Sequence, residues 1–413
     1  MSDFRPFCGY RPAPAFAAHI AAPPYDVLDS EEARRLAAGN ELSFLHVSKP
    51  EIDLPPGTDP YAARVYETGA ANLRRLIERG YLRRDETPHF YVYRLRMGRH
   101  VQTGVVGAAS VADYEQNLIK KHELTRSDKE DDRTWHIEIT NANTGPVFLA
   151  YRPSPAVNRA VESIVTGEPA FDFTAEDEVT HTLWPVGDET LVAQLREGFQ
   201  RTPCLYVADG HHRSAAAVRV ARTRRARNPH HTGQEAYNHF LAVAFPADQL
   251  QILPYNRVVA DLAGLSADQF LGELRKVFDA VATDQPAPSQ LHHFGLYLGG
   301  QWYRLVAKPG TYPAHDVVRC LDVQLLSDNV LGPLLHITDL RTDQRIGFVG
   351  GIRGAAELAR LVDSGRYAAA FAMFPTTVEQ LMTIADAGMI MPPKSTWFEP
   401  KLRSGIVVRL LDD

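Results

Sequence analysis

The sequence predicts an α/β fold (α+β mixed), in which helices pack on mixed sheets. Short apolar runs typical of strands alternate with segments of helical periodicity along the whole chain of 413 residues. With 45% hydrophobic and 23% charged residues, the composition is that of a globular protein. The pattern of elements changes near residue 260, and the sequence shows no fixed-period repeat and no long linker. We therefore expect two domains, residues 1–260 and 261–413.

Residues 1–260 begin with an extended segment rich in proline and alanine. Helical periodicity then predicts helices over 30–39, 60–80, 155–165 and 189–199, and from the turn after residue 209 to about 227. Apolar or alternating runs predict strands over 90–95, 101–111, 146–151, 181–186, 203–208, 240–245 and 253–259. Gly80 is expected to be a helix C-cap, and Gly98 lies near the turn of a hairpin.

Residues 261–413 continue the alternation with shorter elements. Helices are predicted over 267–278, 317–331, 355–362 and 378–387. Strands are predicted over 294–298, 302–306, 345–349, 368–374 and 406–411, the last following a loop at 391–398. This part is expected to be an α/β domain that contributes a closing loop.

Composition excludes several classes of protein. The net charge of −6 argues against a protein that coats nucleic acid, so nucleic acid is not expected as a partner. The three cysteines form no CxxC pattern and are typical of reduced thiols in a reducing compartment. The sequence shows no signal peptide and no apolar run near the roughly 20 residues that span a bilayer. We expect a cytoplasmic protein that binds small molecules, with no membrane partner and no assigned oligomeric state.

One turn near the middle of the chain combines residues suited to binding an anion. The apolar run 203–208 ends at Asp209-Gly210-His211-His212-Arg213, and an alanine-rich helix follows. The start of a helix offers unpaired N–H groups and a partial positive charge. Gly210 lets the backbone approach a ligand, Arg213 can form a bidentate clamp, and Asp209 places a carboxylate beside the anion. The turn is therefore predicted to bind phosphate.

The alternative is a plain helix start that Asp209 caps, with histidines that only pack. A cap leaves His211, His212 and Arg213 unexplained, because cations in the first turn oppose the helix dipole and need an anion to neutralise them. We therefore favour the anion site. A metal site made of His211 and His212 is disfavoured, since adjacent helical residues point about 100° apart.

Residues 119–133 form a second cluster that is dense in both acidic and basic side chains. Taken alone, the segment favours a solvated helix held by i,i+4 ion pairs. In the alternative, Lys121, His122 and Arg126 clamp an anion, and Glu123 acts as a base or as a magnesium ligand. The spacing leaves both interpretations open.

Two further segments are candidates for the functional site. Near the C-terminus, two prolines present Lys394, Ser395 and Thr396, and a loop dense in such residues can wrap phosphate. A stiff surface turn explains the same loop equally well. Near the N-terminus, Tyr25 and Asp26 follow two prolines, where Tyr25 can simply pack and Asp26 can close an Asx turn.

Five motifs together resemble the bacterial family called domain of unknown function 1015. They are PPYDV, KKHELTRSDKEDDR, ADGHHRSAAA, LPYNRVV and MPPKSTWFEPKLRSG, in this order over nearly the whole chain. Ser214 stands where the family usually has an aromatic residue, which removes the basis for a ring-stacking role there. The DGHHR turn is similar to the phosphate-binding motif of the ParB/sulfiredoxin-like superfamily, which includes free-serine kinases. The resemblance implies a ParB/sulfiredoxin-like core in residues 1–260.

The same resemblance implies a small-molecule kinase that transfers a phosphoryl group from ATP, ADP or pyrophosphate to a hydroxyl, with free L-serine as the acceptor. It implies Mg²⁺ as a cofactor, although no metal ligands are assigned. Asp209 or Glu123 would accept the hydroxyl proton or hold the metal. The turn from Gly210 to Arg213 would hold the donor. The remaining candidates form two sets. The basic residues that would neutralise charge are Lys121, Arg126, Lys129 and Arg133. The residues that would bind the substrate are His122, Lys394, Ser395 and Thr396.

Three rival functions remain open. A ParB-like nucleotide-binding or DNA-associated module needs a basic surface, against which the net charge counts. A sulfiredoxin-like enzyme needs a reactive thiol beside the turn, and Cys204 is more typical of a core residue. A phosphohydrolase is compatible with the same site, because water can replace the acceptor.

Overall fold

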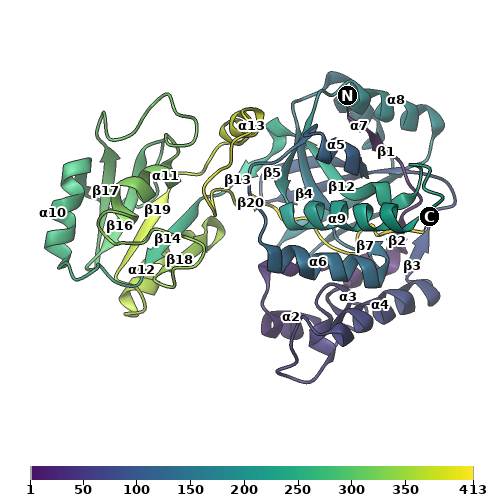
Figure 1. Ribbon diagram of the computed structural model, residues 1–413, viewed down its shortest axis with the longest axis horizontal. Coiled ribbons are helices and arrows are strands. Elements are labelled where there is room, and N and C mark those ends of the chain that lie inside the picture. Colours follow the sequence, from purple (N-terminus) through teal and green to yellow (C-terminus); the bar gives the residue numbers. More distant parts are fainter. Residues whose placement is uncertain (1, 413) are drawn as a thin grey trace. The chain divides into compact units, whose positions relative to one another are not determined.

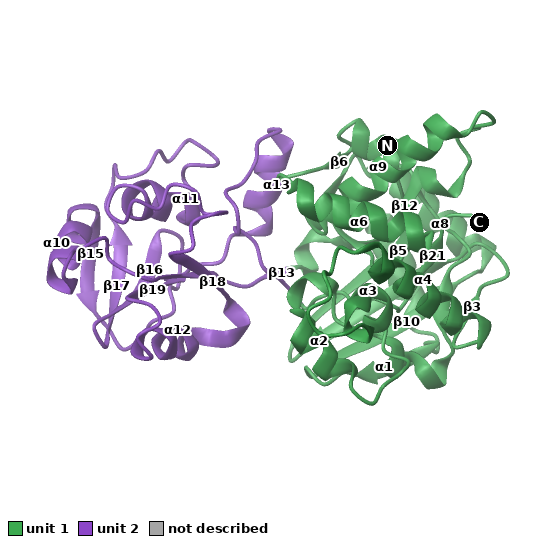
Figure 2. Cartoon of the chain, turned by 60° about the horizontal axis from the view of Figure 1, so that its bottom comes forward, with its two compact units in different colours: residues 1–250, 400–413 green, residues 251–399 purple. Residues whose placement is uncertain are grey.

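The computed structural model describes residues 2–412 and is a mixed α/β structure (Figure 1). It divides into two compact units, residues 1–250 with 400–413, and residues 251–399 (Figure 2). The expected division into 1–260 and 261–413 is therefore corrected, because the end of the chain returns to unit 1. There β21 (Arg409–Leu410) pairs with β7 (Ala142–Asn143), and the Val408 backbone exchanges two hydrogen bonds of 2.8 Å with Tyr10.

A nine-stranded mixed sheet forms the centre of unit 1, in the order β6-β11-β8-β12-β5-β4-β10-β9 with β1 on β5. The β6–β11 and β8–β12 pairs are parallel, and the other neighbours are antiparallel. The strands are β1 Phe4–Arg5, β4 Phe90–Met97, β5 His100–Ser110, β6 Ile119–Lys120, β8 Val147–Tyr151, β9 Phe171–Thr174, β10 Val179–Val186, β11 Leu205–Asp209 and β12 His239–Pro246. A separate ribbon joins β2 (Tyr10–Pro12) to β3 (Leu82–Arg84).

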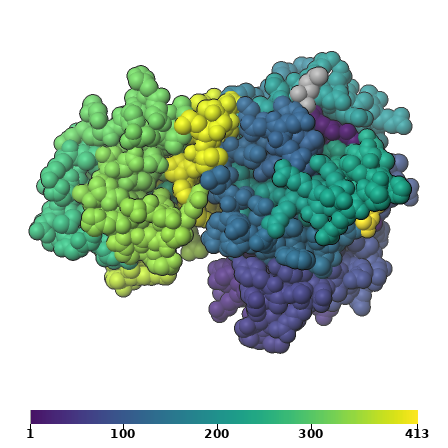
Figure 3. Space-filling model, viewed as in Figure 1, coloured from purple at the N-terminus to yellow at the C-terminus, as the bar shows by residue number. Residues whose placement is uncertain are grey.

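Unit 1 has helices that pack on this sheet and others that pack around a second core cluster. They are α1 Ala17–Ile20, α2 Ser30–Ala37, α3 Leu45–Ser48, α4 Ala63–Glu78, α5 Val111–Glu115, α6 Ser127–Thr140, α7 Pro155–Ile164, α8 Glu189–Gln200 and α9 His211–Arg227. Figure 1 shows α9, α6 and α4 side by side, each in contact with the next. On the surface, α9 in teal and α6 in blue share one face of unit 1 (Figure 3). The small buried residues Ala216, Ala217 and Ala221 let α9 pack closely on the sheet.

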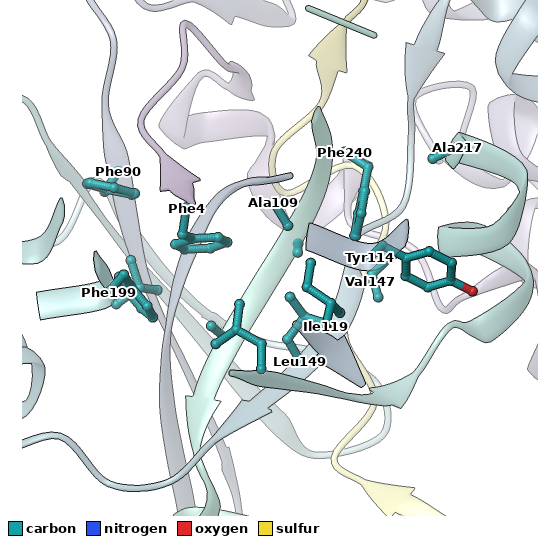
Figure 4. Packing of buried hydrophobic residues seen from close by; sticks show 14 of the residues in the cluster. Phe4, Phe90, Ala109, Tyr114, Ile119, Val147, Leu149, Phe199, Ala217 and Phe240 are labelled. Carbon is teal, nitrogen blue, oxygen red and sulfur yellow. The ribbon is translucent and has the colours of Figure 1, made fainter. Parts of the chain in front are cut away.

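The core of unit 1 contains a cluster of three phenylalanine rings, Phe4, Phe90 and Phe199 (Figure 4). The ring of Phe4 lies 4.6 Å from that of Phe199 and 5.9 Å from that of Phe90, centroid to centroid. Gly107 on β5 faces these rings, because a Cβ there would lie 2.6 Å from the Phe4 ring and 3.0 Å from the Phe90 ring. Only a residue without a side chain fits at this position.

We expect Gly107→Ala to destabilise unit 1 by about 1–3 kcal/mol, because the added methyl group overpacks a core of rigid rings. Gly272→Ala is the matched control. Gly272 lies inside the helix Ala267–Val277 with open space around its Cβ position, so alanine there should stabilise by about 0.5–1 kcal/mol. Urea unfolding followed by circular dichroism measures both changes. Equal midpoints for Gly107→Ala and the parent chain would contradict the packing.

Unit 2 has an antiparallel six-stranded sheet in the order β15-β17-β16-β19-β14-β18. Its strands are β14 Tyr255–Val259, β15 Phe278–Ala282, β16 His293–Leu298, β17 Gln301–Ala307, β18 Ile346–Gly350 and β19 Ala369–Met373, and a short ribbon pairs β13 Gln251–Ile252 with β20 Phe398–Glu399. The helices are α10 Ala267–Val277, α11 Asp322–Leu326, α12 Gly354–Asp363 and α13 Val378–Asp386, and a π-helical turn, Ser327–Leu331, follows α11.

Most predicted elements are confirmed within a few residues, and three are not. The N-terminal segment expected to be extended contains α1 and two 3-10 helices, Pro14–Phe16 and Tyr25–Val27. The helix expected over 317–331 begins only at Asp322, because the Asp316 carboxylate accepts the N–H groups of Val318 and Arg319 and closes a turn before it. The strand expected over 406–411 is reduced to β21. Among residues 2–412, no helix combines the length and the apolar character needed to cross a membrane.

Candidate functional site

The Asp209 turn is a strand, one left-handed residue and a helix, as predicted. β11 ends at Asp209, Gly210 has φ 93°, and α9 begins at His211. The Asp209 carboxylate accepts the Gly210 N–H at 2.7 Å through Oδ1. A positive φ strains a residue with a Cβ, so glycine permits the tight change of direction. The first N–H groups of α9 consequently point out of the helix start with no helical acceptor.

Lys401 is paired with Asp209, with 2.9 Å between Nζ and Oδ2. Burial by itself would raise the pKa of Asp209, but the charges of Lys401 and Arg213 and the Lys401 hydrogen bond hold it well below its usual value. Asp209 is therefore ionised at neutral pH. Lys401 lies within the C-terminal motif, but its pairing with a residue 192 positions away has no local signal in the sequence.

His122, Glu123 and His211 come together beside this turn. β6 runs parallel to β11, with Ile119 opposite Leu205 and Lys120 opposite Tyr206. The residues that follow β6 therefore lie near those that follow β11. The His122 and His211 rings meet edge to face with centroids 4.5 Å apart, and His211 Nδ1 lies 4.0 Å from Glu123 Oε2. The second predicted cluster thus supplies part of the site.

Both imidazoles are neutral. Burial lowers the pKa of His122 to about 4, against smaller opposing effects of the Val207 backbone and the Asp209 carboxylate. Burial lowers the pKa of His211 well below its ordinary value, and the neighbouring His122 adds to the shift. The expectation that the histidines of the first turn act as cations is therefore wrong for His211, because burial removes its charge. Arg213 carries the positive charge of this turn.

Arg213 contacts the N-terminal segment that contains Tyr25 and Asp26. Its guanidinium donates to the Pro146 carbonyl and lies 3.4 Å from Asp26 Oδ2. Next to Asp26, the Tyr25 ring lies 3.8 Å from the Arg133 guanidinium carbon, and Arg133 pairs with Asp132 at 2.7 Å. Tyr25, Arg133 and Arg213 line a small cavity of about 30 Å³, which is the size of a water site. The side chains of Arg133 and Arg213 therefore lie around the same cavity inside unit 1.

The other predicted residues of 119–133 lie in different surroundings. His212 is half-buried, and its Nε2 accepts the Arg126 N–H at 3.1 Å, so His211 and His212 point apart as expected. The exposed Arg126 side chain pairs with Asp128. Lys129 Nζ lies 2.9 Å from the Tyr61 hydroxyl, and Lys121 Nζ lies 4.3 Å from the Tyr114 ring centroid. The contacts of Lys121 and Lys129 are thus with aromatic side chains.

The predicted closing loop belongs to unit 2. Ser395 Oγ donates to the Pro392 carbonyl at 2.6 Å, and the Ser395 carbonyl accepts from Thr376 at 2.9 Å. Arg257, which is fully buried, donates to the Lys394 carbonyl at 2.9 Å. These bonds hold the Lys394–Thr396 backbone within its own unit. The role of Lys394, Ser395 and Thr396 in phosphate binding stays a prediction.

Two rival interpretations can be weighed against the geometry. Several arginines of α9 pair with acidic side chains, with 2.6 Å from Arg222 to Glu115 and 3.2 Å from Arg224 to Glu138, which favours a structural role for them. Cys204 precedes β11, and a five-residue strand rises about 17 Å. The thiol is therefore far from the Asp209 end, which disfavours a sulfiredoxin-like reaction.

Comparisons with known proteins find a family model and several solved structures. The model described as "Protein of unknown function (DUF1015)" matches residues 4–324. A free serine kinase mutant in complex with AMP is 12% identical, with a TM-score of 0.36 over 71% of this chain and 87% of that chain. SbnI with a C-terminal truncation, from Staphylococcus aureus, is 11% identical, with a TM-score of 0.39 over 74% and 87%. A conserved hypothetical protein from Pyrococcus furiosus is 12% identical, with a TM-score of 0.35 over 74% and 95%. No curated protein matches the chain.

Proposed function

The chain belongs to the DUF1015 family of proteins of unknown function, and from the site in unit 1 we propose that it is a small-molecule phosphotransferase. The donor is ATP, ADP or pyrophosphate, and the acceptor is the hydroxyl group of a small molecule. Free L-serine is the proposed acceptor, on the resemblance of the DGHHR turn to the motif of free-serine kinases.

One observation carries the proposal. An ionised carboxylate, Asp209, stands at a left-handed turn into a helix start, with Lys401 and Arg213 as its cationic neighbours. Phosphoryl transfer requires positioning and neutralisation of charge more than covalent chemistry. The helix N-terminus and Arg213 suit the donor phosphates, while Asp209 and Glu123 are the carboxylates available to orient or deprotonate a hydroxyl.

The side chains at the turn do not fit a dedicated Mg²⁺ cage. Mg²⁺ prefers six oxygen ligands in octahedral geometry. The two Asp209 oxygens are engaged by the Gly210 N–H and by Lys401, and the neighbours of Glu123 are two imidazoles. Any Mg²⁺ in the reaction is therefore expected to arrive with the donor phosphates rather than to reside in the protein.

A product screen tests the proposal. Purified protein is incubated with ATP, ADP or pyrophosphate in the presence of Mg²⁺, with and without L-serine or related hydroxyl compounds, and ³¹P NMR identifies the products. We expect a phosphate ester that forms only when donor and acceptor are both present. Phosphate released at the same rate without an acceptor would instead show a phosphohydrolase. No turnover of any donor would refute both enzymes.

A further inference from the structure

Unit 1 contains a group of metal-ligating side chains, and the proposed reaction gives a role only to its carboxylate, Glu123. Among residues 2–412, His122, Glu123 and His211 are the one group of three whose ligand atoms, one from each side chain, all lie within 4.8 Å of one another. His122 follows β6 and His211 starts α9, so the parallel pairing of β6 with β11 brings the two imidazoles together. The group is built by the fold and is not a chance cluster on an exposed loop.

Both imidazoles are buried, and three of their four ring nitrogens make no hydrogen bond of normal geometry to any described residue. His122 is 1% exposed and His211 is 5% exposed. The three nitrogens without such a partner in the described part of the chain are Nδ1 and Nε2 of His122 and Nε2 of His211. A buried polar atom without a partner costs about 1–3 kcal/mol. By contrast, the buried His136 bonds to the Val47 carbonyl at 2.9 Å, and His181 bonds to the Tyr93 hydroxyl at 2.7 Å. The orphaned nitrogens therefore need an explanation specific to this place.

We propose that His122, Glu123 and His211 bind one Zn²⁺ ion. Two neutral imidazoles and one carboxylate are the ligands of catalytic zinc sites, which keep a fourth position open. The partial exposure of Glu123, 38% of its side chain, leaves that position a route to solvent. Mg²⁺ would be a poor occupant, because it prefers oxygen ligands, whereas imidazole suits zinc and its transition-metal neighbours.

The geometry requires a small closure. Ligand atoms about 2.0–2.1 Å from a tetrahedral zinc ion lie about 3.3 Å from one another. The widest separation in the group, 4.8 Å at most, would shrink by about 1.5 Å on binding. Glu123 is on the loop between β6 and α6, so its side chain can make most of that movement. The two histidine rings are already in contact.

The position of the ion defines its possible use. His211 is the first residue of α9, so zinc bound there would lie at the helix start proposed to hold phosphate. An open coordination position could then take a phosphate or hydroxyl oxygen. This use rests on the proposed function, but the binding of zinc does not. Zinc binding is therefore measured without donor or acceptor.

Untagged full-length protein is stripped with a chelator, incubated with Zn²⁺ or Mg²⁺ and desalted, and bound metal is measured by inductively coupled plasma mass spectrometry. We expect one Zn²⁺ per chain and no retained Mg²⁺. Glu123→Gln and His211→Asn should each weaken zinc binding at least tenfold in a chelator competition. His136→Gln, in which an equally buried histidine outside the group is changed, should bind zinc as the parent does.

Folding is controlled separately. Glu123 is partly exposed and Glu123→Gln conserves its volume, so this variant should keep the circular dichroism spectrum of the parent. Zinc should raise the melting temperature of the parent but not that of Glu123→Gln, because only bound metal stabilises the native state. Failure of the parent to retain zinc would overturn the proposal, as would undiminished zinc binding by both Glu123→Gln and His211→Asn. Either result would leave the phosphotransferase proposal standing.

Discussion

Replacing Asp209 with asparagine is expected to lower turnover by about 10²–10⁴-fold, the usual range for loss of a positioned acid or base. The amide conserves volume and still accepts the Gly210 N–H, but it removes the negative charge that faces Lys401. The ground-state fold should survive, because the strand, the turn and the helix start are unchanged in shape. Initial rates of phosphate-ester formation, with circular dichroism as a check on folding, measure the effect.

Asp188→Asn is the matched control for this change. Asp188 caps α8 by accepting the Leu191 N–H at 3.0 Å, and asparagine is an equally good N-cap. The control should therefore leave both stability and turnover at the level of the parent. Turnover by Asp209→Asn at the parent rate would mean that the carboxylate has only a structural role.

Replacing Arg213 with methionine is expected to raise the KM for the phosphate donor about 10–100-fold, since a hydrogen bond to a charged group contributes about 1.5–3 kcal/mol. The guanidinium is largely buried, with 11% of its side chain exposed, so methionine fills similar space without the charge. Arg213→Lys should recover part of the affinity, because it restores the charge but not the planar fork. Steady-state kinetics with varied donor concentration separates KM from kcat.

Arg219→Met serves as the control on the same helix. Arg219 is 48% exposed and pairs with Asp131, an exposed ion pair of the kind that contributes little. Its replacement should leave the KM for the donor unchanged. If Arg219→Met raised KM as much as Arg213→Met, the effect would come from the overall charge of α9 and not from a phosphate site at its start.

The local parts of this site were predictable because each depends on neighbours in the chain. The apolar run, Gly210 and the alanine-rich stretch predict a strand, a left-handed turn and a helix, and these are the elements observed. The mixed α/β class also follows from the alternation of periodicities. In contrast, the positions of the side chains after β6 were not predictable. His122 is buried while Lys121 lies against Tyr114, and this depends on the parallel pairing of β6 with β11, which periodicity does not specify.

The charge of the side chains at the turn was predicted least well from the local sequence. A histidine at a helix start was expected to be a cation, but burial among packed groups keeps His211 neutral, which suits it to the proposed zinc site rather than to binding an anion by its charge. The ion pair between Arg213 and Asp26 likewise brings the N-terminal segment beside the Asp209 turn, which no local pattern indicates.

The sequence by itself determined the Asp209–Arg213 turn, the elements around it and the family, because these depend on contiguous residues. The tertiary structure decided which distant residues join the turn: Lys401 from the returning C-terminus, Asp26 from the N-terminus, and His122 with Glu123 from the edge of the sheet. The physical reason is that strand order and the return of the last segment to unit 1 are set by burial across the whole core. No local pattern encodes them.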